Sequence, residues 1–155
     1  MAIRVGFLLV PLASQKLTME LHGFGLRRGY LLAVRGREYD LHNHYKVVAV
    51  DQDQLTATAG IRLRRCEGAW VPDGVPRGLL LRFEGVSRFR RKAGEPGLEA
   101  DSRAVHFIGF LFSDDETMDG FLDDLTDPTQ DLIIGLEDSS AYRIHAARVT
   151  VEVEG

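Results

Sequence analysis

The sequence has one cysteine and one tryptophan among its 155 residues, and it contains no long apolar run. Because the lone Cys66 cannot form an internal disulfide, the sequence argues against a secreted domain held together by disulfides. No apolar segment approaches the roughly 20 residues that cross a bilayer, so we expect no membrane partner. The apolar residues 3–10 contain Arg4 and end before Pro11. They predict a first strand rather than a signal peptide, and hence a cytoplasmic protein.

The overall composition is that of an ordinary globular protein, with 45% hydrophobic and 27% charged residues. A chain of this length can bury a sizeable core, so we expect residues 1–155 to form a single domain. The charge is uneven, with 16 Lys and Arg against 9 Asp and Glu in residues 1–95, and 3 against 14 in residues 96–155. In an interleaved β-fold the two halves are expected to neutralise each other, and a charged partner is the alternative.

The clearest pattern is a two-residue alternation over residues 131–155. The apolar positions of this alternation are Leu132, Ile134, Leu136, Tyr142, Ile144, Ala146, Val149, Val151 and Val153. Such a period is typical of strands with one buried and one solvent-facing side. The sequence therefore predicts an antiparallel meander at the end of the chain, with Arg143 and His145 on its wet face.

Shorter alternating segments predict further strands near residues 3–9, 17–22, 30–35, 45–50, 55–64, 79–83 and 86–92. Residues 105–112 are different, because both faces of a strand there would be apolar. This pattern predicts a central strand that is covered on both sides. His106 would share one of these apolar faces, so we expect it to be buried and hydrogen-bonded.

One helix is predicted over about residues 114–125. Ser113 is a candidate N-cap with Glu116 three residues later, and an apolar stripe follows at Met118, Phe121, Leu122 and Leu125. Taken together, the elements predict a mainly β fold. We expect an antiparallel β-sandwich or open barrel of about nine or ten strands with this one short helix.

The triplet His42-Asn43-His44 spells the letters of a nuclease motif without its spacing, because in such nucleases the three residues are widely separated along the chain. Two histidines two positions apart on a strand could still share a metal ion. The sequence identifies no third ligand, so we expect a surface loop and no metal site.

Two strand segments are rich in arginine, and they contain Arg62 and Arg64 in one and Arg88 and Arg90 in the other. Neighbouring strands would gather these side chains into a patch suited to nucleic acid or another anionic ligand. Pairing of these arginines with the acidic segments of the chain is the other expectation.

The predicted helix carries acidic residues on its outer face, namely Asp115, Glu116, Asp119, Asp123 and Asp124. Two of them, Asp123 and Asp124, would lie at the negative end of the helix dipole, where carboxylates are unfavourable. Helix stability alone would not select them, which suggests a role in contacting a basic partner. Arg143 and His145 on the wet face of the C-terminal strands are the other predicted partner contacts.

Two segments resemble parts of small bacterial β-rich proteins, including immunity proteins of polymorphic toxin systems. They are Leu81-Arg82-Phe83-Glu84-Gly85-Val86 and residues 132–146, with the turn Glu137-Asp138-Ser139-Ser140. The resemblance covers less than a third of the chain and includes no catalytic motif. It implies a role in binding rather than in catalysis.

The leading hypothesis is therefore a non-enzymatic domain that binds another protein and inhibits it, with no catalytic residue and no cofactor. A nucleic-acid or anionic-ligand binder that uses the arginine strands is the second hypothesis. The third is an enzyme or small-ligand carrier with a pocket at the sheet mouth near Trp70 and His22. The sequence leaves the oligomeric state open, a homodimer included.

Overall fold

The computed structural model describes residues 18–96, 103–111, 116–118 and 129–155. It confirms a mainly β fold, with twelve strands in three sheets and one short helix in the described part of the chain. The elements are β1 (Glu20–His22), β2 (Phe24–Arg27), β3 (Leu31–Val34), β4 (Arg37–Asp40), α1 (Leu41–His44), β5 (Tyr45–Asp53), β6 (Thr58–Arg65), β7 (Gly78–Glu84), β8 (Arg88–Lys92), β9 (Val105–Leu111), β10 (Asp131–Leu136), β11 (Ala141–His145) and β12 (Arg148–Glu154).

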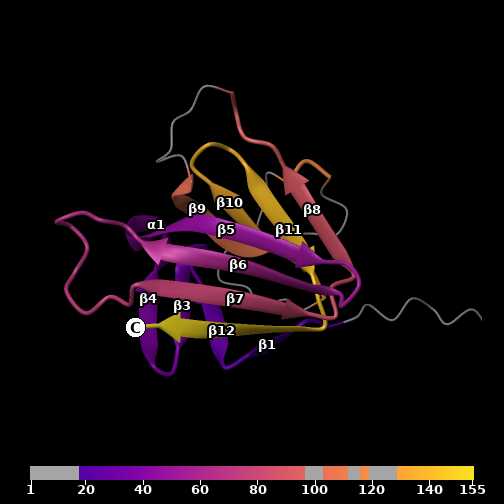
Figure 1. The fold of residues 1–155 in the computed structure, drawn as a ribbon, viewed down its shortest axis with the longest axis horizontal. Helices are drawn as coiled ribbons and strands as arrows, with labels where there is room; N and C mark the ends of the chain where they lie inside the picture. Colours follow the sequence, from indigo (N-terminus) through magenta and orange to yellow (C-terminus); the bar gives the residue numbers. More distant parts are fainter. Residues whose placement is uncertain (1–17, 97–102, 112–115, 119–128) are drawn as a thin grey trace, which may run out of the picture.

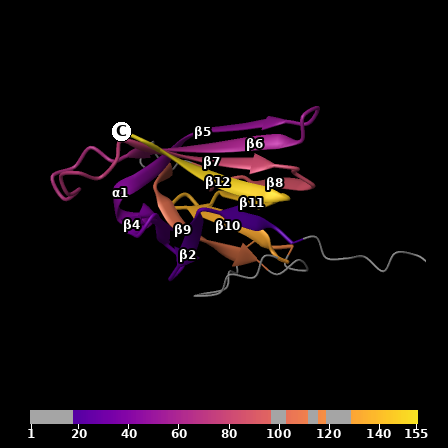
Figure 2. The same ribbon diagram turned by 90° about the horizontal axis from the view of Figure 1, so that it is seen from below.

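Two sheets form the body of the fold. One has five strands in the order β1-β12-β7-β6-β5, and the other has four in the order β8-β11-β10-β9. The side view shows them as separate layers, with the five-stranded sheet above β9 and β10 (Figure 2). A small sheet of β2, β3 and β4 lies beside them near α1 (Figure 1). The pairs are antiparallel except for β1 and β12, which run parallel.

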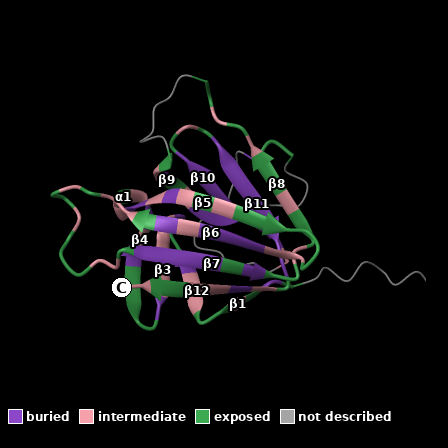
Figure 3. Cartoon of the chain, in the orientation of Figure 1, coloured by how far each residue is buried: buried purple, intermediate pink, exposed green. Residues whose placement is uncertain are grey.

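The core fills the space between the sheets, and the alternation of each strand decides which side chains enter it. From the five-stranded sheet come Ile61 and Leu63 of β6, and from the four-stranded sheet come Ile134 of β10 and Ile144 of β11. Burial is concentrated on β7, β10 and β11, whereas much of β5 and β8 is exposed (Figure 3). Because the core lies between the two sheets, their outer faces point in opposite directions.

One bent antiparallel pair ties the two layers together. The strands β7 and β12 pair in the five-stranded sheet, and their chain neighbours β8 and β11 pair in the other. The crossing segments meet at Gly85, whose positive φ of 66° turns the chain, and at Ala147, whose amide donates to the carbonyls of Glu84 and Gly85. The bend at Gly85 is thus where the chain changes sheets.

Three predictions for the C-terminal half are wrong. The hairpin of β10 and β11 forms as predicted, but β12 leaves it for the other sheet instead of completing a meander. In addition, β10 and β11 are buried at every position, because the second face of their sheet is also covered. Among the described strands, β9 was expected to be central but lies at the edge of its sheet. Its register with β10 shifts between Gly135 and Leu136.

Some predicted elements lie outside the described residues. These are the first strand, at residues 3–9, and nearly all of the helix predicted at residues 114–125. The helix that the structure describes is α1, at the position where a loop was expected. It forms because Asp40 caps the turn, its Oδ1 accepting from the Asn43 amide at 2.9 Å.

Candidate functional site

A hollow of about 570 Å³ opens where β6 ends, β7 begins and β12 ends. We call it the arginine hollow, and its lining residues are Arg62, Leu63, Arg64, Arg65, Glu67, Arg77, Gly78, Glu154 and Gly155. Four arginines and two glutamates therefore surround one depression on the surface. The hollow has an excess of positive charge and suits an anionic group.

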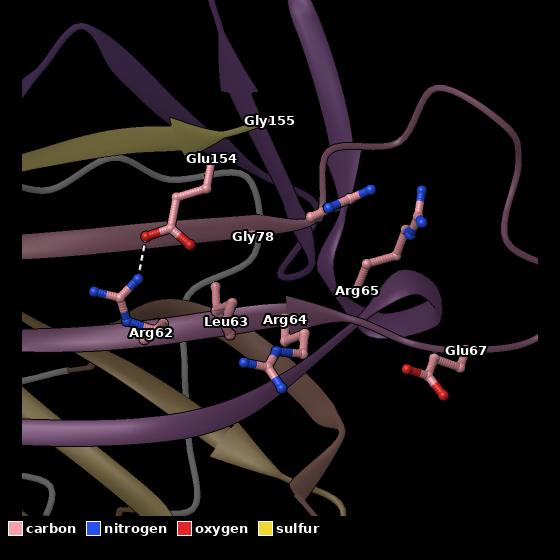
Figure 4. A pocket seen from close by; sticks show the side chains of 9 residues that line it. Arg62, Leu63, Arg64, Arg65, Glu67, Gly78, Glu154 and Gly155 are labelled. Atoms are coloured by element: carbon pink, nitrogen blue, oxygen red, sulfur yellow. Dashed lines mark hydrogen bonds and ion pairs between the residues drawn. The ribbon is translucent and has the colours of Figure 1, made fainter.

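The strand β6 supplies two of the arginines through its alternation. Ile61 and Leu63 point into the core, so Arg62 and Arg64 point outward from the same sheet. On the neighbouring strand Gly78 has no side chain, which leaves room for the Glu154 carboxylate next to it. Glu154 accepts a hydrogen bond from Arg62 across β7, as Figure 4 shows. Arg62 is therefore neutralised within the hollow.

The other three arginines differ in whether the fold provides a hydrogen-bond partner for the side chain. Arg65 donates from Nη1 to the carbonyl of Val75 at 2.9 Å, which ties it to the loop of residues 66–77. Arg64 and Arg77 are exposed, and within the described part of the chain neither side chain makes an ion pair or hydrogen bond. These two guanidinium groups are therefore free to meet a ligand.

The loop of residues 66–77 is fixed against the fold by two aromatic side chains. Tyr45 is buried and its hydroxyl donates to the carbonyl of Pro76 at 3.0 Å, and burial raises the pKa of that hydroxyl well above its ordinary value. Trp70 donates from Nε1 to the carbonyl of Asn43 at 3.0 Å, and its ring occupies the space that a side chain at Gly68 would need. Trp70 therefore packs against the backbone of α1 and against its own loop at Gly68.

Trp70 nevertheless remains 66% exposed, although a tryptophan ring is a large apolar surface to leave in water. Its polar edge is satisfied and its position is set, while most of its apolar surface is open. Both ends of this loop line the arginine hollow, one through Glu67 and the other through Arg77. A fixed exposed tryptophan and an arginine hollow therefore belong to one structural unit.

The two arginine strands do not form a single patch, and that prediction is wrong. Arg62 and Arg64 lie on the outer face of the five-stranded sheet, whereas Arg88 and Arg90 lie on the outer face of the other. Their strands belong to different sheets, whose outer faces point apart. Arg88 instead pairs with the buried Asp131 at 2.7 Å, as expected if arginines meet the acidic segments of the chain.

The predicted exposure of Arg143 and His145 is also wrong. Arg143 is 1% exposed and donates from Nε to Asp131 Oδ2 at 2.5 Å, while His145 Nδ1 lies 3.1 Å from Asp131 Oδ1. Burial acts to raise the pKa of Asp131, but the hydrogen bonds from Arg143 and Arg88 outweigh it and hold the pKa below its ordinary value. These residues form a buried ionic network inside the fold and are not open to a partner.

The acidic residues predicted to contact a partner, Asp115, Asp119, Asp123 and Asp124, lie outside the described residues. Glu116 is described and exposed, and with Arg90, Arg91 and Lys92 it borders a shallow hollow along β8. The acidic-helix hypothesis therefore stays a prediction.

The histidines are placed differently from what the sequence predicts. His106 is exposed rather than buried on an apolar face. His42 and His44 lie on α1, where residues two positions apart do not face each other, so they do not share a metal ion as a pair. His42 instead lies near His106, from the distant strand β9, with ring centroids 5.8 Å apart.

The chain matches no protein-family model, no curated protein and no solved structure. The described part of the chain has no helix with the length and apolar character needed to span a membrane. No relative therefore indicates a function for this fold, and the evidence for one is the chemistry of the residues on its surface.

Proposed function

We propose that the protein is a non-enzymatic binding domain that recognises an acidic segment of another protein through the arginine hollow and Trp70. The observation that supports this most is that the loop of residues 66–77, which carries the fixed and exposed Trp70, also lines the hollow that holds the free Arg64 and Arg77. Arginine and tryptophan are among the residues most often found at the energetic centres of protein interfaces.

The fixed geometry favours strong binding. Ordering a flexible side chain on association costs about 0.5–1.5 kcal/mol, and this cost is smaller where the side chain is already held. Trp70 is held by its bond to Asn43, and the loop is held by the contacts of Arg65 and Tyr45. A partner would thus meet a surface that needs little rearrangement.

The mixed charge of the surface favours a protein over a nucleic acid. Glu67 and Glu154 line the arginine hollow, and Glu152 pairs with Arg82 farther along the same face. A run of phosphates would meet these carboxylates, whereas single carboxylates of a peptide can each find one arginine. Base stacking would also require several aromatic side chains, and the loop offers Trp70 alone.

The resemblance of residues 81–86 and 132–146 to immunity proteins supports a more specific proposal, in which binding inhibits the partner. Inhibition requires only that a tightly bound domain cover a partner's active surface. It needs no catalytic group on this chain.

A peptide selection tests the proposal directly, because a random library contains acidic segments of every spacing. The full chain is used to select binders from a phage-displayed library of random peptides. For selected peptides without tryptophan, binding is then followed by the fluorescence of Trp70, which is the sole tryptophan of the sequence and therefore reports on this loop. We expect peptides rich in Asp and Glu.

Variants assign the binding to the site. Binding by the variants is measured by titration calorimetry, because Trp70→Ala removes the only tryptophan of the sequence. The double variant Arg64→Gln, Arg77→Gln and the single variant Trp70→Ala should each weaken binding about 30-fold or more, the effect of losing about 2 kcal/mol at an interface centre. Arg90→Gln removes an arginine that is also exposed, on the other sheet, and should leave binding unchanged. Selected peptides without acidic residues, or equal losses in Arg90→Gln, would contradict the proposal, as would displacement of the peptide by a single-stranded oligonucleotide.

A further inference from the structure

Three metal-ligating side chains from distant parts of the sequence converge beside α1. They are His42 of α1, His106 of β9 and Glu137, which directly follows β10. One ligand atom from each residue can be chosen so that all three lie within 4.8 Å of one another. Among the described residues this is the one group of three or more histidine, cysteine or acidic side chains that converges in this way.

A β-bulge directs His106 toward this cluster. Gly135 lies opposite Phe107 and Leu136 lies opposite Val105, so β9 has one residue more than β10 at this point. The extra residue is His106. Val105 on one side enters the core, while the His106 side chain turns outward. Bulges commonly redirect a side chain in this manner at functional sites.

His42 is held in a state that suits a metal ligand. Its Nδ1 lies 3.0 Å from the carbonyl oxygen of Val105, and since a carbonyl can only accept, Nδ1 carries the hydrogen. In this tautomer the lone pair lies on Nε2, and a cation would bind there. Histidine ligands of metals usually donate their other ring N–H to a carbonyl or carboxylate in this way.

Glu137 faces both rings. Its Oε1 lies 3.4 Å from Nδ1 of His106 and 3.6 Å from Nδ1 of His42. The backbone of Glu137 is anchored, because its amide donates to the carbonyl of Ala104 at 3.0 Å. The carboxylate is therefore positioned by the same part of the sheet that positions the two histidines.

We propose that His42, His106 and Glu137 bind a divalent transition-metal ion of the zinc class. Two imidazole nitrogens and one carboxylate oxygen suit zinc, whereas calcium and magnesium take oxygen ligands. Ligands at zinc's bond lengths in a tetrahedron lie roughly 3.3 Å apart. The three side chains are partly exposed, so they can rotate toward this spacing, with His42 binding through Nε2 while Nδ1 keeps its bond to Val105. The fourth position is open to water or to an external ligand.

The competing account is an ion pair without a metal, in which Glu137 accepts from protonated histidines. The pair of His22 and Glu20 on β1 offers a matched control, because Nδ1 and Oε1 lie 3.2 Å apart there and both side chains are exposed. The control pair has the chemistry of the cluster without its third member. This proposal does not depend on the binding function of the arginine hollow.

The test is a calorimetric titration of the full chain with Zn²⁺ after dialysis against a chelator. We expect one saturable event with a stoichiometry of one, a rise in the unfolding temperature with Zn²⁺, and no response to Mg²⁺. His106→Gln and Glu137→Gln should each abolish the event, and His22→Gln should leave it intact. Both altered side chains are exposed, so the variants should keep the circular dichroism of the wild type.

A spectroscopic titration with Co²⁺ provides a second readout. A site with two histidines and a carboxylate should give the visible absorption of tetrahedral cobalt, and Zn²⁺ should remove it. The proposal is overturned if no saturable binding is found. It is likewise overturned if His106→Gln and Glu137→Gln bind Zn²⁺ as the wild type does, or if His22→Gln loses binding equally.

Discussion

The substitution Asp131→Ala provides the sharpest test of the interior of this fold. The side chain of Asp131, the first residue of β10, is buried. Its Oδ2 accepts from Arg143 at 2.5 Å and from Arg88 at 2.7 Å. Its Oδ1 lies 3.1 Å from Nδ1 of His145. Removing the carboxylate would therefore withdraw the shared acceptor of three basic side chains.

The expected loss in the free energy of unfolding follows from these contacts. Breaking a buried ion pair by removing one partner costs about 3–5 kcal/mol, because the remaining charge stays buried. Arg88 is nearly half exposed and can be solvated, and Arg143 has further interactions, so we expect the lower end, about 3 kcal/mol. The control is Glu152→Gln, which breaks the exposed pair with Arg82 and should have no measurable effect.

The pH dependence separates an ionic role for Asp131 from simple packing. Since the folded pKa of Asp131 is below its ordinary value, the stabilisation is complete above the unfolded pKa of about 3.9. It is lost as the pH falls through the lower folded value. Urea unfolding of wild type and Asp131→Ala at pH 7 should differ by about 3 kcal/mol, and the difference should shrink by about pH 2. A difference that stays constant with pH would refute the ionic account.

Two further predictions concern packing and a single hydrogen bond. Gly135→Ala should destabilise the fold by about 1–3 kcal/mol, because a Cβ there would lie 2.2 Å from the Phe107 ring. The control in thermal unfolding is Gly25→Ala, since a Cβ at Gly25 would have no atom within 4 Å. Tyr45→Phe should cost about 1 kcal/mol in urea unfolding through loss of the bond to the Pro76 carbonyl. Burial raises the pKa of the Tyr45 hydroxyl, so this hydroxyl should ionise in alkali only when the chain unfolds. The extra tyrosinate absorbance of the wild type relative to Tyr45→Phe should therefore appear together with unfolding, and not at a lower pH.

The fold class was predictable because the alternation of apolar and polar residues along a strand indicates which side of the strand faces the core. The pairing of β5 with β6 and of β10 with β11 follows from such alternation on either side of a short polar connection. What alternation does not record is whether the second face of a sheet is also covered. That is why Arg143, which alternates with apolar residues like any surface charge, lies in the interior.

The partners of the charged residues were less predictable, because they come from remote strands. Arg143 is buried by virtue of Asp131 on the neighbouring strand, and Arg62 is neutralised by Glu154 from the end of the chain. A sequence shows each charge but not its neighbour across a sheet. For the same reason the triplet at residues 42–44 shows no third metal ligand, since Glu137 follows β10 and reaches the cluster only in the folded chain.

The bulge at His106 illustrates a further limit of pattern reading. An uninterrupted two-residue period places His106 on the same face as Ile108 and Phe110, and both of those do enter the core. One extra residue relative to β10 shifts the phase at this position and turns the histidine outward. Because a bulge depends on the partner strand, a single strand's sequence does not contain the signal.

The four residues of α1 connect the two candidate sites. The carbonyl of Asn43 accepts from Trp70 on one side, and His42 belongs to the metal-ligand cluster on the other. The helix itself is anchored by its Asp40 cap and by the bond from the Leu41 amide to the carbonyl of Tyr30. An α-helix of one turn has little stability of its own, so these contacts determine its position. A cation that fixes His42 would therefore also restrain Asn43, whose carbonyl holds Trp70. Both proposed functions thus require that α1 be well ordered.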